Sequence, residues 1–121
     1  EPRLGVGGII NLHPQPGEEQ TYFSSGRPYT SDYAIIAMLP GLKPGHRTLI
    51  LAGTNTYGVQ AGAEFVCRAD LVADLLSRLR VQGHSRLPDF EALLEVKVSG
   101  GVPVQARLLL LRLRTPASVQ R

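Results

Sequence analysis

The sequence predicts an α/β protein: a Rossmann-like mixed sheet of about five strands in two or three layers, with two helices and a C-terminal β-hairpin. Three observations predict it. Residues 33–39 (YAIIAML) and 48–52 (TLILA) are almost continuously apolar, as expected for strands covered on both faces. Helical periodicity begins shortly after the second run. Near the end of the chain, two alternating runs are separated by Gly100-Gly101, a strong hairpin signal.

The composition is typical of one globular domain covering residues 1–121, with 43% hydrophobic and 19% charged residues. No apolar run approaches the roughly 20 residues of a membrane helix, and the longest, residues 107–113, is interrupted by Arg112. The chain starts at Glu1 without a signal sequence, so we expect a C-terminal fragment of a longer protein. One cysteine excludes an internal disulfide and fits a reducing compartment, so we expect a cytoplasmic protein.

The N-terminal third is expected to be mainly irregular. Its first glycines are followed by a β-like run at residues 9–12, which excludes a dinucleotide motif because that motif requires a helix there. A proline-rich surface segment follows, with a short strand expected at residues 20–23. The connection between residues 33–39 and 48–52 contains no helical pattern, so we expect these two strands to pair antiparallel.

Two helices are expected before the C-terminal hairpin. In the first, Val59, Ala63 and Val66 recur at helical spacing, and the small residues 61–63 would let the helix approach the sheet closely. The second covers residues 69–80 and is ended by the turn signals at residues 83–85 and Pro88.

The hairpin strands are predicted from alternation over residues 90–99 and 102–113. In the second strand, one face is expected to carry Val104, Ala106, Leu108 and Leu110, and the other Leu109, Leu111 and Leu113. Half of that other face is apolar, so we expect a helix, another domain or a partner to cover it. Residues from 115 onward are interpreted as a tail.

The loop from Gly53 to Gly58 is the best candidate site. A strand that ends in a glycine-containing turn at a helix N-terminus exposes backbone N–H groups in the positive field of the helix dipole, which suits phosphate or carboxylate. The same residue types also serve as an ordinary capped turn. If the long loop before residue 33 folds over the strand ends, a pocket at residues 53–58 would also be lined by Arg27, Tyr29 and Tyr33. The candidate ligand-binding residues are Gly53, Thr54, Asn55, Thr56, Tyr57 and Gly58.

Other chemistries are not indicated. His13, His46 and His84 are widely spaced, so no metal site is predicted. Cys67 lies in a helical pattern with no histidine nearby in the sequence, which favours core packing over nucleophilic catalysis. No cofactor is predicted, because a phosphate-binding lysine motif and a nucleophile elbow are missing. Residues 97–121 carry five basic and no acidic residues; we interpret them as a solvated face and do not expect nucleic-acid binding.

A larger pattern, extending from about Asn11 to Leu113, resembles a family of soil-bacterial proteins that is common in Acidobacteria. The matching residues are Asn11, Pro14, Pro16, Gly17, Glu18, Tyr33-Ala34, Leu39-Pro40, Leu51-Ala52-Gly53-Thr54, Gly58 and Ala63-Glu64-Phe65. The family has no assigned activity, and its members look like regulatory or signalling proteins with a Rossmann-like C-terminal half. The resemblance implies a preceding segment with a strand, a proline-rich loop and an aromatic helix. A family G-T-x-x-x-G-T motif is matched only in part, because Val59 replaces the second threonine.

These observations predict a non-catalytic ligand-sensing or protein-interaction module of a larger regulatory protein, with an anion or nucleotide-type site at residues 53–58. The expected partners are a small anionic ligand, the N-terminal domain of the same protein and a second copy of the chain, with no membrane contact. The alternative is a nucleotide or sugar-phosphate enzyme whose catalytic residues lie partly in the preceding segment.

Overall fold

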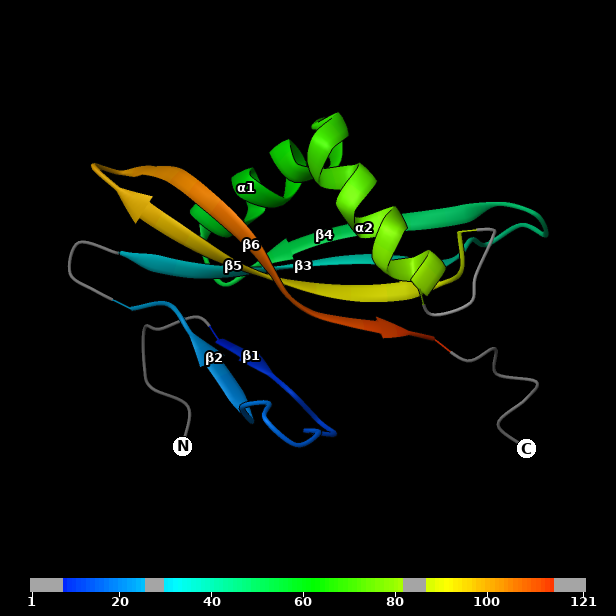
Figure 1. Ribbon diagram of the computed structural model, residues 1–121, viewed down its shortest axis with the longest axis horizontal. Helices are drawn as coiled ribbons and strands as arrows, with labels where there is room; N and C mark the ends of the chain where they lie inside the picture. Colours follow the sequence, from blue (N-terminus) through cyan, green and yellow to red (C-terminus); the bar gives the residue numbers. More distant parts are fainter. Residues whose placement is uncertain (1–7, 26–29, 82–86, 115–121) are drawn as a thin grey trace.

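The computed structural model describes residues 8–25, 30–81 and 87–114, which form two antiparallel sheets and two helices (Figure 1). The elements are β1 (Gly8–Ile10), β2 (Thr21–Phe23), β3 (Ser31–Pro40), β4 (Arg47–Gly53), α1 (Thr56–Cys67), α2 (Ala69–Val81), β5 (Phe90–Ser99) and β6 (Val102–Leu113). Strands β1 and β2 form a small hairpin. The other four form the main sheet in the order β4-β3-β5-β6.

The predicted Rossmann-like mixed sheet of five strands is wrong, and the fold is α+β. All strand pairings in the described parts of the chain are antiparallel. Helices α1 and α2 connect β4 to β5, which run parallel, but these two strands do not pair because β3 lies between them. A βαβ unit of a Rossmann sheet would pair them directly. The position of β3 between β4 and β5 depends on pairing between residues far apart in the sequence, which local sequence patterns do not indicate.

Local expectations were more successful. The antiparallel pairing of β3 with β4 is confirmed, and β5 and β6 have the predicted bounds. Gly100 and Gly101 both have positive φ, 60° and 79°, as a two-residue hairpin turn between antiparallel strands requires. The turn at residues 83–85, including His84, and the tail from residue 115 lie outside the described residues.

The two helices cover one face of the main sheet, and the core lies between these layers (Figure 1). On β3 the inward positions alternate, so that Ala34 and Ile36 face the helices together with Leu94 and Val96 of β5. Helix α1 contributes Phe65 to this core, and α2 contributes Leu75 and Leu79. Burying each aliphatic side chain contributes about 1.5–3 kcal/mol, so the core makes the helix face the better stabilised side of the sheet. Neither helix has the length and apolar character needed to cross a membrane.

The opposite face of the main sheet carries the β1–β2 hairpin (Figure 1). Tyr22 of β2 packs against Tyr33 of β3 with ring centroids 5.3 Å apart and a tilt of 58°. Such a tilted arrangement is favourable for aromatic pairs. Apart from one backbone bridge between Ser25, just after β2, and Ser31 of β3, the described contacts of the hairpin with the sheet are made by side chains.

The expected alternation of β6 is wrong in its C-terminal half, because the pairing with β5 shifts register between Leu93 and Leu94. This bulge leaves Leu109 unpaired and reverses the faces beyond it. As a result, Leu111 and Leu113 pack against the helix-side core, whereas Leu110 lies opposite Leu93 on the face that carries the hairpin. The apolar residues in the C-terminal half of β6 therefore contact elements of the same chain on both faces of the sheet, whereas Val102 and Val104 are exposed.

Candidate functional site

The predicted loop does form the junction between β4 and α1. Gly53 is the last residue of β4, and Asn55 caps α1 by accepting a hydrogen bond from the Thr56 N–H at 2.8 Å. Thr56 begins the helix, and Tyr57 packs against the hydrophobic core. The six candidate residues thus form a capped turn between β4 and α1, which is the ordinary role that these residue types also suggest.

The polar groups of this turn converge on Asp32, which is fully buried at the start of β3. Gly58 donates its backbone N–H to Asp32 Oδ2 at 2.7 Å, and Ser24 donates its hydroxyl to Asp32 Oδ1 at 2.6 Å. The Thr54 hydroxyl also donates to Asp32 Oδ1 and accepts from the Tyr33 N–H at 3.1 Å. Three donors therefore surround one internal carboxylate.

Asp32 occupies the position that an anionic ligand would take at the start of α1. The N–H of Gly58, in the first turn of the helix, is one of the four that an α-helix leaves unpaired at its N-terminus. The positive end of the helix dipole favours a negative charge there. An external anion at this turn would have to compete with a carboxylate that the fold already supplies.

Gly58 is required by this packing. A Cβ at this position would collide with the carbonyl oxygen of Tyr33 and would lie 3.1 Å from Asp32 Oδ2. Replacing Gly58 or Thr54 would therefore disturb the fold as well as any ligand at the turn.

A second candidate site is a cavity of about 350 Å³ between the β1–β2 hairpin and the main sheet. Most of its lining is apolar, and four polar residues lie at its boundary. The apolar residues are Ile9, Ile10, Leu12, Tyr22, Ile35, Ala92, Leu93 and Leu110; the polar ones are Asn11, His13, Glu91 and Arg112. Mostly apolar concave sites with a few converging polar groups are the usual form of small-molecule pockets.

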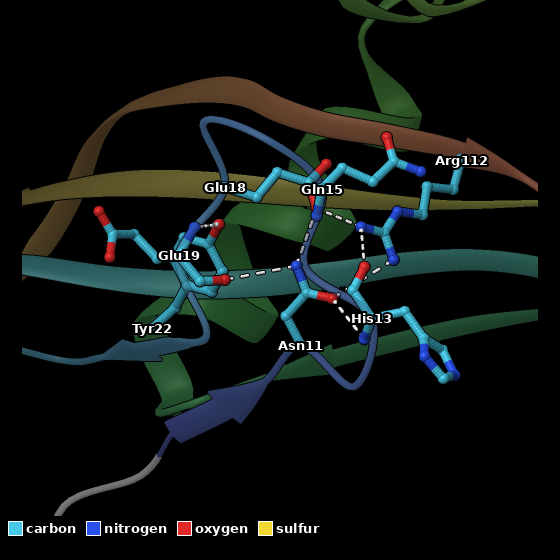
Figure 2. A network of polar contacts seen from close by, with 7 residues as sticks. All are labelled: Asn11, His13, Gln15, Glu18, Glu19, Tyr22 and Arg112. Carbon is cyan, nitrogen blue, oxygen red and sulfur yellow. Dashed lines mark hydrogen bonds and ion pairs between the residues drawn. The ribbon is translucent and has the colours of Figure 1, made fainter.

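Arg112 of β6 lines the cavity and belongs to a polar network with residues of the connection between β1 and β2 (Figure 2). Its guanidinium forms an ion pair with Glu18, donates to the His13 carbonyl oxygen at 3.0 Å and contacts Asn11 Oδ1 at 3.3 Å. Asn11 in turn donates from Nδ2 to Glu18 Oε1 at 2.9 Å. The network joins the turn of the hairpin to a residue about a hundred positions later in the chain. Arg112 Nε is buried and has no hydrogen-bond partner among the described residues.

The electrostatics of this network favour an ionised Glu18. Its pKa is lowered below the ordinary value of 4.5, first because Glu18 accepts a hydrogen bond from the Gln15 N–H and next because it accepts one from Asn11. The charge of Arg112 lowers this pKa further. On the same face, burial of Tyr33 raises the pKa of its phenol, and the nearby Glu95 carboxylate acts in the same direction.

The remaining predicted groups lie elsewhere. Cys67 is exposed at the end of α1, so the predicted core packing of its side chain is wrong. Arg27 and Tyr29 lie outside the described residues. The backbone of Tyr33 bonds to Thr54 of the turn, but its ring packs on Tyr22. Within the described ranges, no group of three or more His, Cys, Asp or Glu side chains is placed to hold a metal ion.

Basic residues of β6 and just beyond are paired with acidic ones. Arg107 contacts Glu95 at 3.0 Å and Arg114 contacts Glu91 at 2.8 Å. The run of positive charge in the sequence is therefore partly neutralised by the acidic residues of the neighbouring strand.

Sequence reasoning missed Asp32 and Arg112. A signal for Asp32 was present, because it precedes an apolar strand and alternates in phase with Ala34 and Ile36, which predicts an inward side chain. No local signal links Arg112 to Glu18. No protein-family model, curated protein or solved structure matches the chain.

Proposed function

We propose that this chain is a ligand-binding module and that its ligand occupies the cavity between the β1–β2 hairpin and the main sheet. The ligand class is a small apolar molecule with an oxygen acceptor at one end, of which an aliphatic or aromatic carboxylic acid is the simplest case. The observation that carries this proposal is the mainly apolar cavity bounded by Arg112, whose buried Nε–H has no partner among the described residues.

The size and lining of the cavity support a ligand of this class. Its volume of about 350 Å³ is near the lower end of the roughly 300–1,000 Å³ common for small-molecule sites. Ile35, Leu93 and Leu110 form an apolar floor on the sheet, and Ile9 and Tyr22 of the hairpin line the opposite side of this half-open cavity. Transfer of an alkyl or aryl group from water to such a surface is favourable.

Charge supports an acidic end group near Arg112. Glu91, the acidic residue of the lining, is paired with Arg114 at 2.8 Å. Arg112 already donates to Glu18, His13 and Asn11, but a guanidinium has five N–H donors, and the Nε–H has no acceptor among the described residues. A ligand oxygen at Nε would also satisfy a buried donor, which is costly to leave unpaired.

The cavity is a better candidate than the turn at residues 53–58, because Asp32 already supplies a carboxylate at the turn. The resemblance to soil-bacterial regulatory proteins supports placing this module in a larger regulatory protein. The enzyme alternative depends on residues of a preceding segment and stays a prediction.

The test is a screen of small acids and matched neutral alcohols by two-dimensional amide NMR, with octanoate and octanol as the first pair. We expect saturable shifts at Ile9, Ile35, Leu93 and Leu110, larger for the acid than for the alcohol. Leu110→Trp should fill the cavity and weaken binding by at least about tenfold. Arg112→Lys keeps the charge but removes the Nε donor, and it should reduce the preference for the acid.

Val59→Trp is the matched control, because Val59 is exposed on α1 on the other side of the sheet. It should leave binding unchanged. If acids perturb the amides of residues 53–58 and not those of the cavity, or if Leu110→Trp binds as well as the unmodified chain, the proposed site is wrong.

A further inference from the structure

The two edges of the main sheet differ in how they are protected from pairing with another strand. Edge strand β6 contains Pro103 and two register shifts, and it carries Arg107 and Arg112. Prolines, bulges and charges are the usual devices that prevent edge-to-edge association.

The other edge, β4, has none of these devices over residues 48–53 (TLILAG). It contains no charge and no proline there, and it pairs with β3 over seven consecutive residues without a register shift. Leu49 is 44% exposed and Ile50 39% exposed. A flat apolar edge of this kind is a template for another strand.

Two hydrogen bonds at the ends of β4 show which of its residues bond to β3 and which have backbone groups that point away from the sheet. The Thr54 N–H donates to the Tyr33 carbonyl at 2.9 Å, and the Gly41 N–H donates to the His46 carbonyl at 2.7 Å. Since hydrogen-bonded pairs recur every second residue, the even positions of β4 bond to β3. The outward positions are Arg47, Leu49, Leu51 and Gly53, whose N–H and C=O groups point away from the sheet.

These four positions are self-complementary. If two copies pair antiparallel about a twofold axis at Ile50, Leu49 of one lies opposite Leu51 of the other, and Arg47 lies opposite Gly53. All four outward positions then meet outward positions, whereas a twofold axis at residue 49 or 51 matches only three. A twofold contact requires such self-complementarity.

Side chains match in the same register. Ile50 meets Ile50 of the second copy across the axis, and Leu49 lies beside Leu51 of that copy on the helix face, so the exposed apolar side chains cover one another. Arg47 does not obstruct the contact, because its guanidinium is held by Asp89 Oδ1 and the Leu87 carbonyl, each at 2.6 Å.

We propose that two copies of this chain associate through β4, antiparallel and centred on Ile50, to form one continuous sheet. The helices of both copies then lie on one face of the joined sheet. The hairpins and their cavities lie on the other. The interaction does not depend on the ligand proposed above.

The first experiment is sedimentation of the purified chain over a wide concentration range, with Ile50→Lys, Ile50→Glu and Val104→Lys. We expect a reversible monomer–dimer equilibrium. Each Ile50 variant should be monomeric, because two like charges meet at the axis, and an equimolar mixture of the two should dimerise again. Val104 is 60% exposed on β6, so Val104→Lys serves as the matched control and should not alter the equilibrium.

A second measurement tests the register. In a Cys67→Ser background, Ile50→Cys should form an intermolecular disulfide readily, because residues of a non-hydrogen-bonded antiparallel pair lie about 4.5 Å apart between their Cα atoms. Leu87→Cys, also on the surface, should not. Amide NMR spectra establish that each variant is folded. A chain that stays monomeric at all concentrations, or a dimer that survives both Ile50 substitutions, would overturn the proposal.

Discussion

Asp32 illustrates how one buried side chain connects three segments. Its carboxylate accepts from Ser24 after β2, from Thr54 after β4 and from the Gly58 N–H in α1. These donors carry no formal charge, so the buried carboxylate is stabilised by hydrogen bonds and by the helix dipole rather than by an ion pair.

Asp32→Ala should therefore lower the free energy of unfolding by on the order of 3 kcal/mol, because three donors lose their acceptor in the interior. Urea denaturation measures this change. Asp74→Ala is the control: Asp74 is exposed and pairs with Arg78 one helical turn later, so its loss should cost below about 0.5 kcal/mol. Similar losses for both variants would contradict the role assigned to Asp32.

The two buried glycines of α1 should respond differently to alanine. Gly58→Ala brings a Cβ into the Tyr33 carbonyl and should destabilise the protein by about 2 kcal/mol or more. At Gly62 the nearest atom to an added Cβ is the Ala34 Cβ at 3.8 Å, an ordinary contact. Gly62→Ala should therefore be neutral or stabilising by up to about 1 kcal/mol, because alanine favours the helix. Thermal unfolding of both variants checks the order.

The contribution of Glu18 to the free energy of unfolding should depend on pH. Its folded pKa lies below the ordinary value of 4.5, so the unfolded chain binds the proton more readily. The stabilisation is thus fully present above pH 4.5 and is lost as pH falls through the lower, folded pKa. The difference in unfolding free energy between the unmodified chain and Glu18→Gln should be constant near neutrality and shrink below pH 4.5. A difference that grows on acidification would show that the sign is wrong.

At the scale of elements, the hairpin and the main sheet are held very differently. Strands β3 and β5 have a hydrogen-bonded neighbour on both sides, whereas β1 and β2 have only each other. The hairpin is attached mainly by the Tyr22–Tyr33 contact, the Ser24–Asp32 hydrogen bond and the Glu18–Arg112 network.

Hydrogen exchange should reflect this difference. We expect the amides of β1 to exchange before those of β3 and β5, because local opening of the hairpin leaves the main ladder intact. Arg112→Ala should accelerate exchange in the hairpin several-fold and leave the centre of β3 unchanged. Mass spectrometry of deuterated peptides measures both. Equal protection of β1 and β3 would mean that the hairpin and sheet open as one unit.

At the scale of the whole molecule, the sheet separates two roles. The helix face carries the hydrophobic core that stabilises the fold, while the other face contains the proposed ligand cavity and Arg112. Association through β4 would join two such sheets edge to edge and leave both cavities on the same face of the dimer.

The same division of scale explains what could be predicted from the sequence. Periodicity and turn residues identified the long strands, both helices and the Gly100-Gly101 hairpin, because each depends on neighbouring residues. The Rossmann-like topology was wrong because the position of β3 between β4 and β5 depends on distant pairing.

The site shows the same limit. The turn at residues 53–58 was predicted as a helix N-terminus, and α1 does begin there, whereas the anion site stays a prediction. The alternation of β3 indicates that Asp32 points inward, but it does not indicate that its carboxylate accepts from Gly58, 26 residues later. Likewise, Glu18 and Arg112 are 94 positions apart and form one ion pair only after the hairpin has packed on the sheet.

The internal carboxylate has one further consequence, in chemical rescue. An Asp32→Gly variant would keep the Ser24 and Thr54 hydroxyls and the Gly58 N–H but remove the group that they bind. Formate has the size and charge of the missing carboxylate, so added formate should raise the melting temperature of this variant and not that of the unmodified chain. The turn at residues 53–58, which normally binds the Asp32 carboxylate of β3, would then bind a soluble anion instead.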